Sequence, residues 1–200
     1  MKITHPQLNQ ARASLFNFCA AYSKQPSCGR TVILYGENGS GKTRLIKQVC
    51  RWASLTAQFM PMVNRPDLGD QTGLAYSLFY HWPSVVDEFQ KRQDIGAVDE
   101  LMDCSLAVVD DIGAEHDPSG FGREQLYLLL SRREYKWNLF TTNFAPAEWD
   151  NKFERRIASR LFRNAEHIDL SMVPDFSTVN LKPLIQSPEL AKKFREAAKV

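Results

Sequence analysis

The sequence has no large excess of charge and no long apolar run. Its 25 Lys and Arg stand against 23 Asp and Glu, so the net charge of +2 gives no overall basic field of the kind that attracts nucleic acid. No apolar run approaches the roughly 18 residues that cross a bilayer, and the N-terminus lacks the apolar segment of a signal peptide. We therefore expect a cytoplasmic protein without a membrane partner, whose contacts with DNA, if any, rest on local patches.

Cysteine is scarce, and its four positions are far apart. Together with the four histidines, the cysteines show no CxxC pair and no spacing typical of a metal site. The pattern indicates neither a zinc domain nor a disulfide-rich secreted domain. We expect reduced thiols at Cys19, Cys28, Cys50 and Cys104.

The apolar content is sufficient for one domain, because 44% of the 200 residues are hydrophobic. Short apolar runs alternate with segments whose apolar residues recur at helical spacing, which is typical of a parallel α/β sheet. Strands are predicted at residues 31–35, 58–63, 105–109, 138–142 and 166–170. Helices are predicted at residues 8–24, 42–55, 122–136 and 153–163, with one or two more between 70 and 103, the better one at 83–92.

Three segments are predicted along the chain. Residues 1–30 form an N-terminal helix and lead-in, residues 31–172 form the core domain, and residues 173–200 form a tail. In the tail, Ser187 and Pro188 are typical of the first positions of a helix. This short helix either packs on the domain, which we favour, or docks a partner.

One segment fits the nucleotide-binding pattern G-x-x-x-x-G-K-[ST] completely and lies between a predicted strand and a predicted helix, as the motif requires. Glycines let backbone N–H groups surround phosphates, and the helix start adds the positive end of its dipole. We expect Lys42 to reach the β and γ phosphates of ATP, and Thr43 to bind Mg²⁺. The predicted nucleotide-binding residues are Gly36, Glu37, Asn38, Gly39, Ser40, Gly41, Lys42, Thr43 and the adjoining Arg44.

Two aspartates follow the buried strand predicted at 105–109, where a parallel sheet would bring them beside the phosphate loop. This is the arrangement of a Walker B motif. Asp110 would hold Mg²⁺ through a water, and Asp111 would orient or deprotonate the attacking water. Neighbouring carboxylates raise one another's pKa when no metal neutralises them. The alternative is a helix-capping turn.

Asn143 follows the strand predicted at 138–142. A neutral amide at this strand end can bridge the γ-phosphate and the attacking water, and we interpret Asn143 as such a sensor. The alternative, of equal weight on this residue alone, is an asparagine that starts a turn for structural reasons.

Arginines crowd the helix predicted at 153–163. They are Arg155, Arg156, Arg160 and Arg163, and the last three share one face. Like charges repel there unless an anion comes from outside, and phosphoryl transfer commonly receives an arginine from a neighbouring subunit. The pattern therefore predicts hydrolysis that depends on self-association, with a solvated basic face or a DNA-phosphate patch as alternatives.

Four motifs in order resemble the DnaC/DnaI helicase loaders and the IstB transposition helpers, a family of AAA+ ATPases. They occupy residues 106–115, 123–127, 141–143 and 154–161, and the similarity covers roughly residues 10–172. The resemblance implies an AAA+ (RecA-like) P-loop three-layer fold on a five-stranded parallel sheet, binding of single-stranded DNA, and ATP-dependent assembly. It also implies that the arginine of the Ser-Arg-Leu element acts in trans, which matches Arg160, with Arg156 as the second candidate.

The chain departs from the family pattern in three places. Only about 30 residues precede the first strand, where loaders usually carry a separate helicase-binding domain. Pro174 and Asp175 follow the last strand, where loaders tend to place an arginine. The residues after Leu170 are too few for a full C-terminal lid domain.

A surface for single-stranded DNA is predicted between the second and third strands, because aromatic residues occur there with basic residues nearby. The residues are Tyr76, Phe79, Tyr80, Trp82, Lys91 and Arg92. The alternative, which we favour, is that these aromatic residues belong to the core.

The sequence thus supports several functions on one scaffold. The leading hypothesis is a replicative-helicase loader that hydrolyses ATP in a DNA-associated oligomer, of a phage or mobile-element type. The second is an IstB-like helper of a transposase. The third, of another class, is a binding switch that responds to ATP with little turnover. A small-molecule kinase is a remote fourth, because no acceptor site is recognisable.

Overall fold

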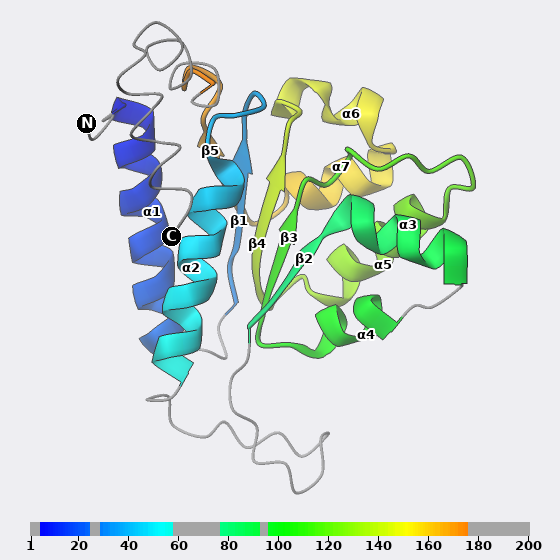
Figure 1. The fold of residues 1–200 in the computed structure, drawn as a ribbon, viewed down its shortest axis with the longest axis horizontal. Helices are drawn as coiled ribbons and strands as arrows, with labels where there is room; N and C mark the ends of the chain where they lie inside the picture. Colours follow the sequence, from blue (N-terminus) through cyan, green and yellow to red (C-terminus); the bar gives the residue numbers. More distant parts are fainter. Residues whose placement is uncertain (1–4, 25–28, 58–76, 93–95, 176–200) are drawn as a thin grey trace, which may run out of the picture.

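The computed structural model describes residues 5–24, 29–57, 77–92 and 96–175. Within these ranges, five strands form one parallel sheet in the order β2-β3-β4-β1-β5 (Figure 1). The strands are β1 (Thr31–Tyr35), β2 (Ser77–His81), β3 (Leu106–Asp110), β4 (Trp137–Thr142) and β5 (Ala165–Asp169). The predicted α/β class and the five-stranded parallel sheet are confirmed.

Helices cover both faces of the sheet, which makes three layers (Figure 1). On one face lie α1 (Pro6–Lys24) and α2 (Lys42–Ala57). On the other lie α3 (Trp82–Arg92), α4 (Gly96–Asp103), α5 (Phe121–Arg132) and α7 (Arg155–Phe162), with η2 (Pro146–Glu148) and α6 (Trp149–Lys152) leading into α7. Side chains of β1 alternate between the layers, since Val32 and Leu34 pack under α1 and α2 while Ile33 packs on the opposite side.

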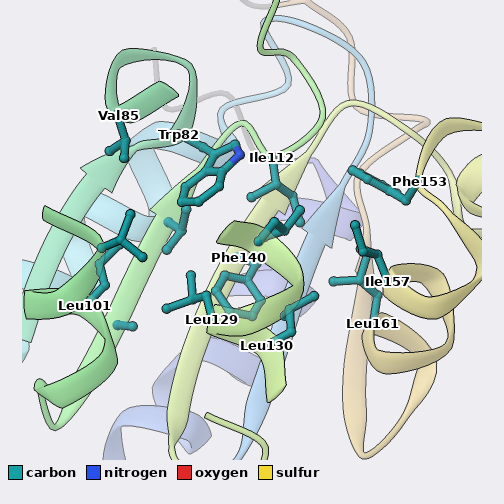
Figure 2. Packing of buried hydrophobic residues seen from close by; sticks show 14 of the residues in the cluster. Trp82, Val85, Leu101, Ile112, Leu129, Leu130, Phe140, Phe153, Ile157 and Leu161 are labelled. Carbon is teal, nitrogen blue, oxygen red and sulfur yellow. The ribbon is translucent and has the colours of Figure 1, made fainter. Parts of the chain in front are cut away.

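The larger helical layer packs on β3 and β4 through buried apolar side chains. Figure 2 shows Phe140 of β4 beside Leu129 of α5, with Trp82 at the start of α3 and Leu161 of α7 on either side. All four are 0% exposed. Burial of such side chains is the main favourable contribution to folding.

The N-terminal helix α1 packs against one face of the sheet. Every residue predicted to face inward from residues 8–24 is buried, and two of them pack edge-on against Trp137 of β4. The inward residues are Leu8, Ala11, Leu15, Phe18, Cys19 and Tyr22. The helical spacing of apolar residues therefore identified the packed face correctly.

The one or two helices predicted between residues 70 and 103 are confirmed as α3 and α4, and α3 matches the helix predicted at 83–92, but strand β2 in the same segment was not predicted. Residues 77–81 pair in parallel with β3, and Phe79 and Tyr80 pack on opposite layers. Five residues of alternating pattern are too short to stand out against the helical pattern that follows. The strand predicted at 58–63 lies outside the described residues.

Two predicted helices have different boundaries in the structure. The helix predicted at 122–136 ends at Arg132, and the helix predicted at 153–163 is α7, which begins at Arg155 and ends at Phe162. Phe153 has an extended backbone with φ −102° and ψ 145° and a buried ring. The extended backbone at this buried residue delays the start of α7 by two residues relative to the prediction.

A buried arginine ties together the amino-terminal ends of the central strands. Arg133 is 0% exposed and donates hydrogen bonds to the carbonyls of Leu101 (2.7 Å), Cys104 (2.8 Å) and Trp137 (2.8 Å). Its Nε donates to Oδ1 of Asn138 at 2.6 Å. This guanidinium therefore links the end of α4 to the starts of β3 and β4.

The chain after β5 runs beside α1, where the Met172 amide donates to Oε1 of Gln7 at 3.1 Å. The helix predicted from Ser187 lies outside the described residues, as does most of the predicted segment 173–200. No helix within the described ranges has the length and apolarity needed to cross a membrane.

Candidate nucleotide-binding site

The phosphate loop connects β1 to α2, as the sequence motif predicts. Gly36 and Gly41 have positive φ angles of 147° and 94°, which side chains rarely allow. At Gly36 a Cβ would collide with the backbone of Leu170, whereas at Gly41 it would extend into open space. Gly41 therefore leaves room in front of the loop that any other residue would fill.

A cavity of about 790 Å³ opens in front of this loop. The described residues that line it come from the loop, the first turns of α2 and the carboxyl ends of β3 and β4. The lining residues are Asn38, Gly39, Gly41, Lys42, Thr43, Arg44, Lys47, Gln48, Arg51, Asp111 and Asn143. The structure thus brings most of the predicted loop residues together with Asp111 and Asn143 around one space, whereas Gly36, Glu37 and Ser40 do not line its described part.

Lys42 is the buried cation of the site, at 4% exposure. Its Nζ donates hydrogen bonds to the carbonyls of Gly36 (2.8 Å) and Glu37 (3.0 Å). Burial lowers the pKa of Lys42, and the nearby carboxylates of Asp111 and Asp110 act in the opposite direction. The ammonium is therefore held within the loop and attracted toward the two acids.

The two aspartates at the end of β3 are held by one hydroxyl of β4. Thr141 donates from Oγ1 to Oδ1 of Asp110 at 2.6 Å and accepts from the Asp111 amide at 2.9 Å. Asp110 is buried, and Asp111 has a left-handed backbone with φ 59°. Burial is the main cause of the raised pKa of Asp111, and Asp110 adds to it, as predicted for this residue.

His81, at the end of β2, also reaches the second aspartate. Its Nε2 lies 3.6 Å from Oδ2 of Asp111, and its Nδ1 shares a hydrogen bond of 2.8 Å with Oγ of Ser84. Sequence reasoning missed His81 because it missed β2. It also assigned no role to Thr141, although this residue precedes the predicted strand end by one position and faces Asp110.

Two polar atoms at the site have no hydrogen-bond partner among the described residues. They are Oδ1 of Asn143, which lies at the cavity, and Oγ of Ser40, which is 0% exposed within the loop. Buried polar atoms are usually paired, so unpaired ones at a cavity indicate a ligand. Together with the open space at Gly41 and the two acids that attract Lys42, they fit a nucleotide phosphate group with a hard cation such as Mg²⁺.

Asp175, just after β5, lies against the phosphate loop. A Cβ added to Gly39 would collide with the carboxylate of Asp175. The position where loaders tend to place an arginine is therefore occupied here by an acid that is in contact with the loop.

The arginines of the predicted trans group do not line the described part of the cavity. Arg156 donates to Glu124 and to Glu154, both at 2.7 Å, and these carboxylates raise its pKa. Arg163 lies 3.3 Å from Glu134. Anions for Arg156 and Arg163 are thus supplied by the same chain, from the residue before α7 and from other elements.

Arg160 is bound differently from Arg156. Its guanidinium lies 4.2 Å from the centre of the Tyr127 ring and donates to the Tyr127 hydroxyl (3.1 Å) and the Arg156 carbonyl (3.0 Å). Arg156 lies over the same ring at 4.6 Å. In the described part of the chain, Arg160 thus contacts neutral groups and no carboxylate.

The DNA surface predicted between the second and third strands is not formed as expected. Trp82 is 0% exposed in the core, and the Tyr80 hydroxyl donates to Glu100 at 2.6 Å. Lys91 is paired with Asp87 at 2.6 Å. Tyr76 and the Arg92 side chain lie outside what the structure describes. The core alternative is confirmed for Trp82.

Structural comparison relates this arrangement to DNA-replication proteins. The DnaC helicase loader matches with a TM-score of 0.66 and 16% identity, over 84% of this chain and 93% of the other. DnaI matches with a TM-score of 0.61 and 20% identity, over 82% of both chains. AMPPCP-bound DnaA from Aquifex aeolicus matches with a TM-score of 0.60 and 16% identity, over 92% of this chain and 53% of DnaA.

The chain has the AAA+ fold. The resemblance to DnaC and DnaI predicted from four short motifs is confirmed for the AAA+ fold over most of the chain. The sequence itself matches no protein-family model and no curated protein. At these identities the comparisons establish the AAA+ architecture, and the chemistry must be argued from the site.

Proposed function

We propose that this AAA+ chain binds ATP with Mg²⁺ and hydrolyses it as one subunit of a DNA-associated assembly. The observation that carries the proposal is the single cavity around which a complete phosphate loop, Asp111 and Asn143 converge, with Asp110 behind them. Asn143 supplies an unpaired polar atom at this cavity, and Ser40 supplies another within the loop.

Each residue has a role that its position supports. Lys42 would exchange its two loop carbonyls for phosphate oxygens, and the loop amides and the start of α2 would bind the remaining charge. Thr43 and Asp110 would hold Mg²⁺, which neutralises phosphate charge when bound. Asp111, whose raised pKa favours proton acceptance, would orient or deprotonate the water, and Asn143 would position it.

We assign the trans arginine to Arg160 and keep Arg156 as the second candidate. Arg156 would have to give up two carboxylates to act on a neighbouring subunit, whereas Arg160 would give up a tyrosine and a carbonyl. Both arginines donate charge-assisted hydrogen bonds, but only Arg156 has anionic acceptors, so the release of Arg160 loses less Coulomb attraction. The described cavity lining contains no arginine from α7, which leaves that place for another subunit.

A replicative-helicase loader is the function that we favour for the assembly. Its support is the match to the DnaC loader, which covers nearly the whole of that chain. Another structural neighbour is a DnaA initiator described as bound to AMPPCP and single-stranded DNA. An IstB-like transposase helper remains the alternative on the same scaffold, and an ATP-dependent switch with little turnover is the alternative of another class.

The trans arginine is tested by mixing two inactive variants. ATP turnover per subunit should rise with protein concentration in the wild type and fall roughly 10³-fold in Arg160→Ala. Lys42→Ala lacks the phosphate-binding lysine but keeps Arg160, so mixing it with Arg160→Ala should restore part of the turnover. Arg163→Ala is the matched control and should retain activity. Full turnover by Arg160→Ala would refute the assignment, and nucleotide binding without turnover in the wild type would favour the switch.

The partner is tested by affinity capture with Asp111→Asn, which should retain ATP without hydrolysing it. Asparagine tolerates the left-handed backbone found at position 111, so the loop should keep its shape. Recovery of a replicative helicase in an ATP-dependent manner would support the loader. Recovery of a transposase would support the helper.

A further inference from the structure

The exposed face of α2 carries three cations that have no acidic partner in the described part of the chain. Arg44, Lys47 and Arg51, which we call the basic stripe, recur at spacings of three and four residues and so share one face. The α2 sequence KTRLIKQVCRWASLTA contains no acid. The stripe is therefore a concentrated positive charge on a single helix.

This arrangement disfavours the isolated helix. Like charges three and four residues apart repel, and cations near a helix start oppose the helix dipole. Arg44 lies in the first turn of α2, where no acid compensates it. A bound anion would relieve both effects.

Several other exposed cations of the described chain are paired with its own acids. Arg156 lies 2.7 Å from Glu124, and Lys91 lies 2.6 Å from Asp87. Arg163 likewise lies 3.3 Å from Glu134. These three cations are thus compensated by acids of the same chain, whereas no acid in the described part of the chain pairs with the three cations of α2.

A nucleotide in the phosphate loop does not account for the whole stripe. Arg51 is eight residues beyond Thr43, which corresponds to about 12 Å along a helix. The cavity nevertheless continues along α2 as far as Arg51. Lys47 lies 5.3 Å from the centre of the Phe79 ring on β2, so an aromatic ring flanks the stripe.

We propose that the basic stripe binds the phosphodiester backbone of a nucleic-acid strand. From Arg44 to Arg51 the helix rises about 10.5 Å. A strand carries one negative charge per roughly 3.4 Å of axis, so about three phosphates face the three cations. This inference rests on the proposed function, because it names a contact for the DNA of that assembly.

A second copy of this chain is a poorer occupant. The acids nearest the trans arginines, Glu124 and Glu154, are already bound by Arg156. Glu134 is paired with Arg163. Docking this surface on the stripe would exchange existing ion pairs for new ones, whereas a nucleic-acid strand brings unpaired anions of its own and releases counterions.

Binding of a fluorescein-labelled oligothymidine, measured by anisotropy over a series of salt concentrations, tests the proposal. The Lys47→Gln/Arg51→Gln variant should bind at least about tenfold more weakly at low salt. The slope of log affinity against log salt should fall by about 1.4 for the single strand, or by about 1.8 for a duplex probe. The matched control, Lys24→Gln/Arg30→Gln, removes two exposed cations elsewhere and should bind as the wild type does.

Unchanged affinity and slope in the α2 variant would overturn the proposal, as would a wild-type chain that binds neither probe at low salt. Loss of binding in Lys91→Gln with the α2 variant unaffected would place the contact on α3 instead. If the α2 substitutions leave nucleic-acid binding unchanged but alter the sedimentation coefficient of the protein alone, the proposal is wrong and the stripe binds another copy of the chain. Binding of ATP to the wild type is measured separately by equilibrium dialysis. Absence of ATP binding would refute the ATPase proposal and would leave the test of nucleic-acid binding by the stripe unaffected.

Discussion

Replacement of Arg133 by methionine should destabilise the protein strongly. Methionine fills much of the volume of the arginine stem but donates no hydrogen bond. The change would leave the carbonyls of Leu101, Cys104 and Trp137 and Oδ1 of Asn138 without the donor that now reaches them at 2.6 to 2.8 Å. Each unpaired buried acceptor costs about 1–3 kcal/mol, whereas removing the buried charge recovers part of its desolvation penalty.

The balance favours a loss of about 4 kcal/mol, the range seen when one partner of a buried charged network is removed. For a chain of this size such a loss lowers the melting temperature by roughly 8–16 °C. Urea unfolding followed by circular dichroism should show a lower midpoint with an unchanged slope. The neighbouring exposed Arg132→Met is the control and should change the free energy of unfolding by less than about 1 kcal/mol. A loss below about 1 kcal/mol in Arg133→Met would show that these acceptors find other donors, and would refute the reasoning.

Two further predictions concern the site and the core. Thr141→Val removes the hydroxyl that donates to Asp110 and accepts from the Asp111 amide. The Mg²⁺ concentration for half-maximal ATPase activity should therefore rise about 10–100-fold. An unchanged Mg²⁺ requirement would contradict the role given to Thr141. Burial raises the pKa of Cys19 to about 12, with Cys50 adding to the effect, so at about pH 8 only about one part in ten thousand is thiolate. Native Cys19 should therefore resist iodoacetamide while the urea-unfolded chain reacts, as peptide mass spectrometry would show; equal rates in the two states would contradict this.

Most of the sheet could be predicted because its strands are buried on both faces. The apolar run before Asp110 and the run before Asn143 match β3 and β4 within one residue, and both strands are fully buried. Strand β2 was not found, although the other edge strand, β5, was, because the helical pattern of α3 follows β2 directly at Trp82.

The parts of the site that were not predicted depend on contacts between distant segments. Glu124 neutralises Arg156 across 32 positions of sequence, and no local pattern in the arginine helix indicates that partner. His81 reaches Asp111 only because β2 pairs with β3 in a register that places His81 beside Asp110. The phosphate loop, by contrast, is one continuous motif, so its residues could be named without knowledge of the fold.

The hydroxyl of Thr141 makes the site depend on strand register. Asp110 follows the Val109–Phe140 pair, which puts Thr141 in position to hold both acids. A shift of β3 by one residue would turn the carboxylates to the opposite face of the sheet, whereas a change in the length of the connection between these strands need not move them. In evolutionary terms, insertions between residues 113 and 136 are tolerable at this site as long as the pairing survives, so this connection can be reshaped for new partners without altering the chemistry at the strand ends.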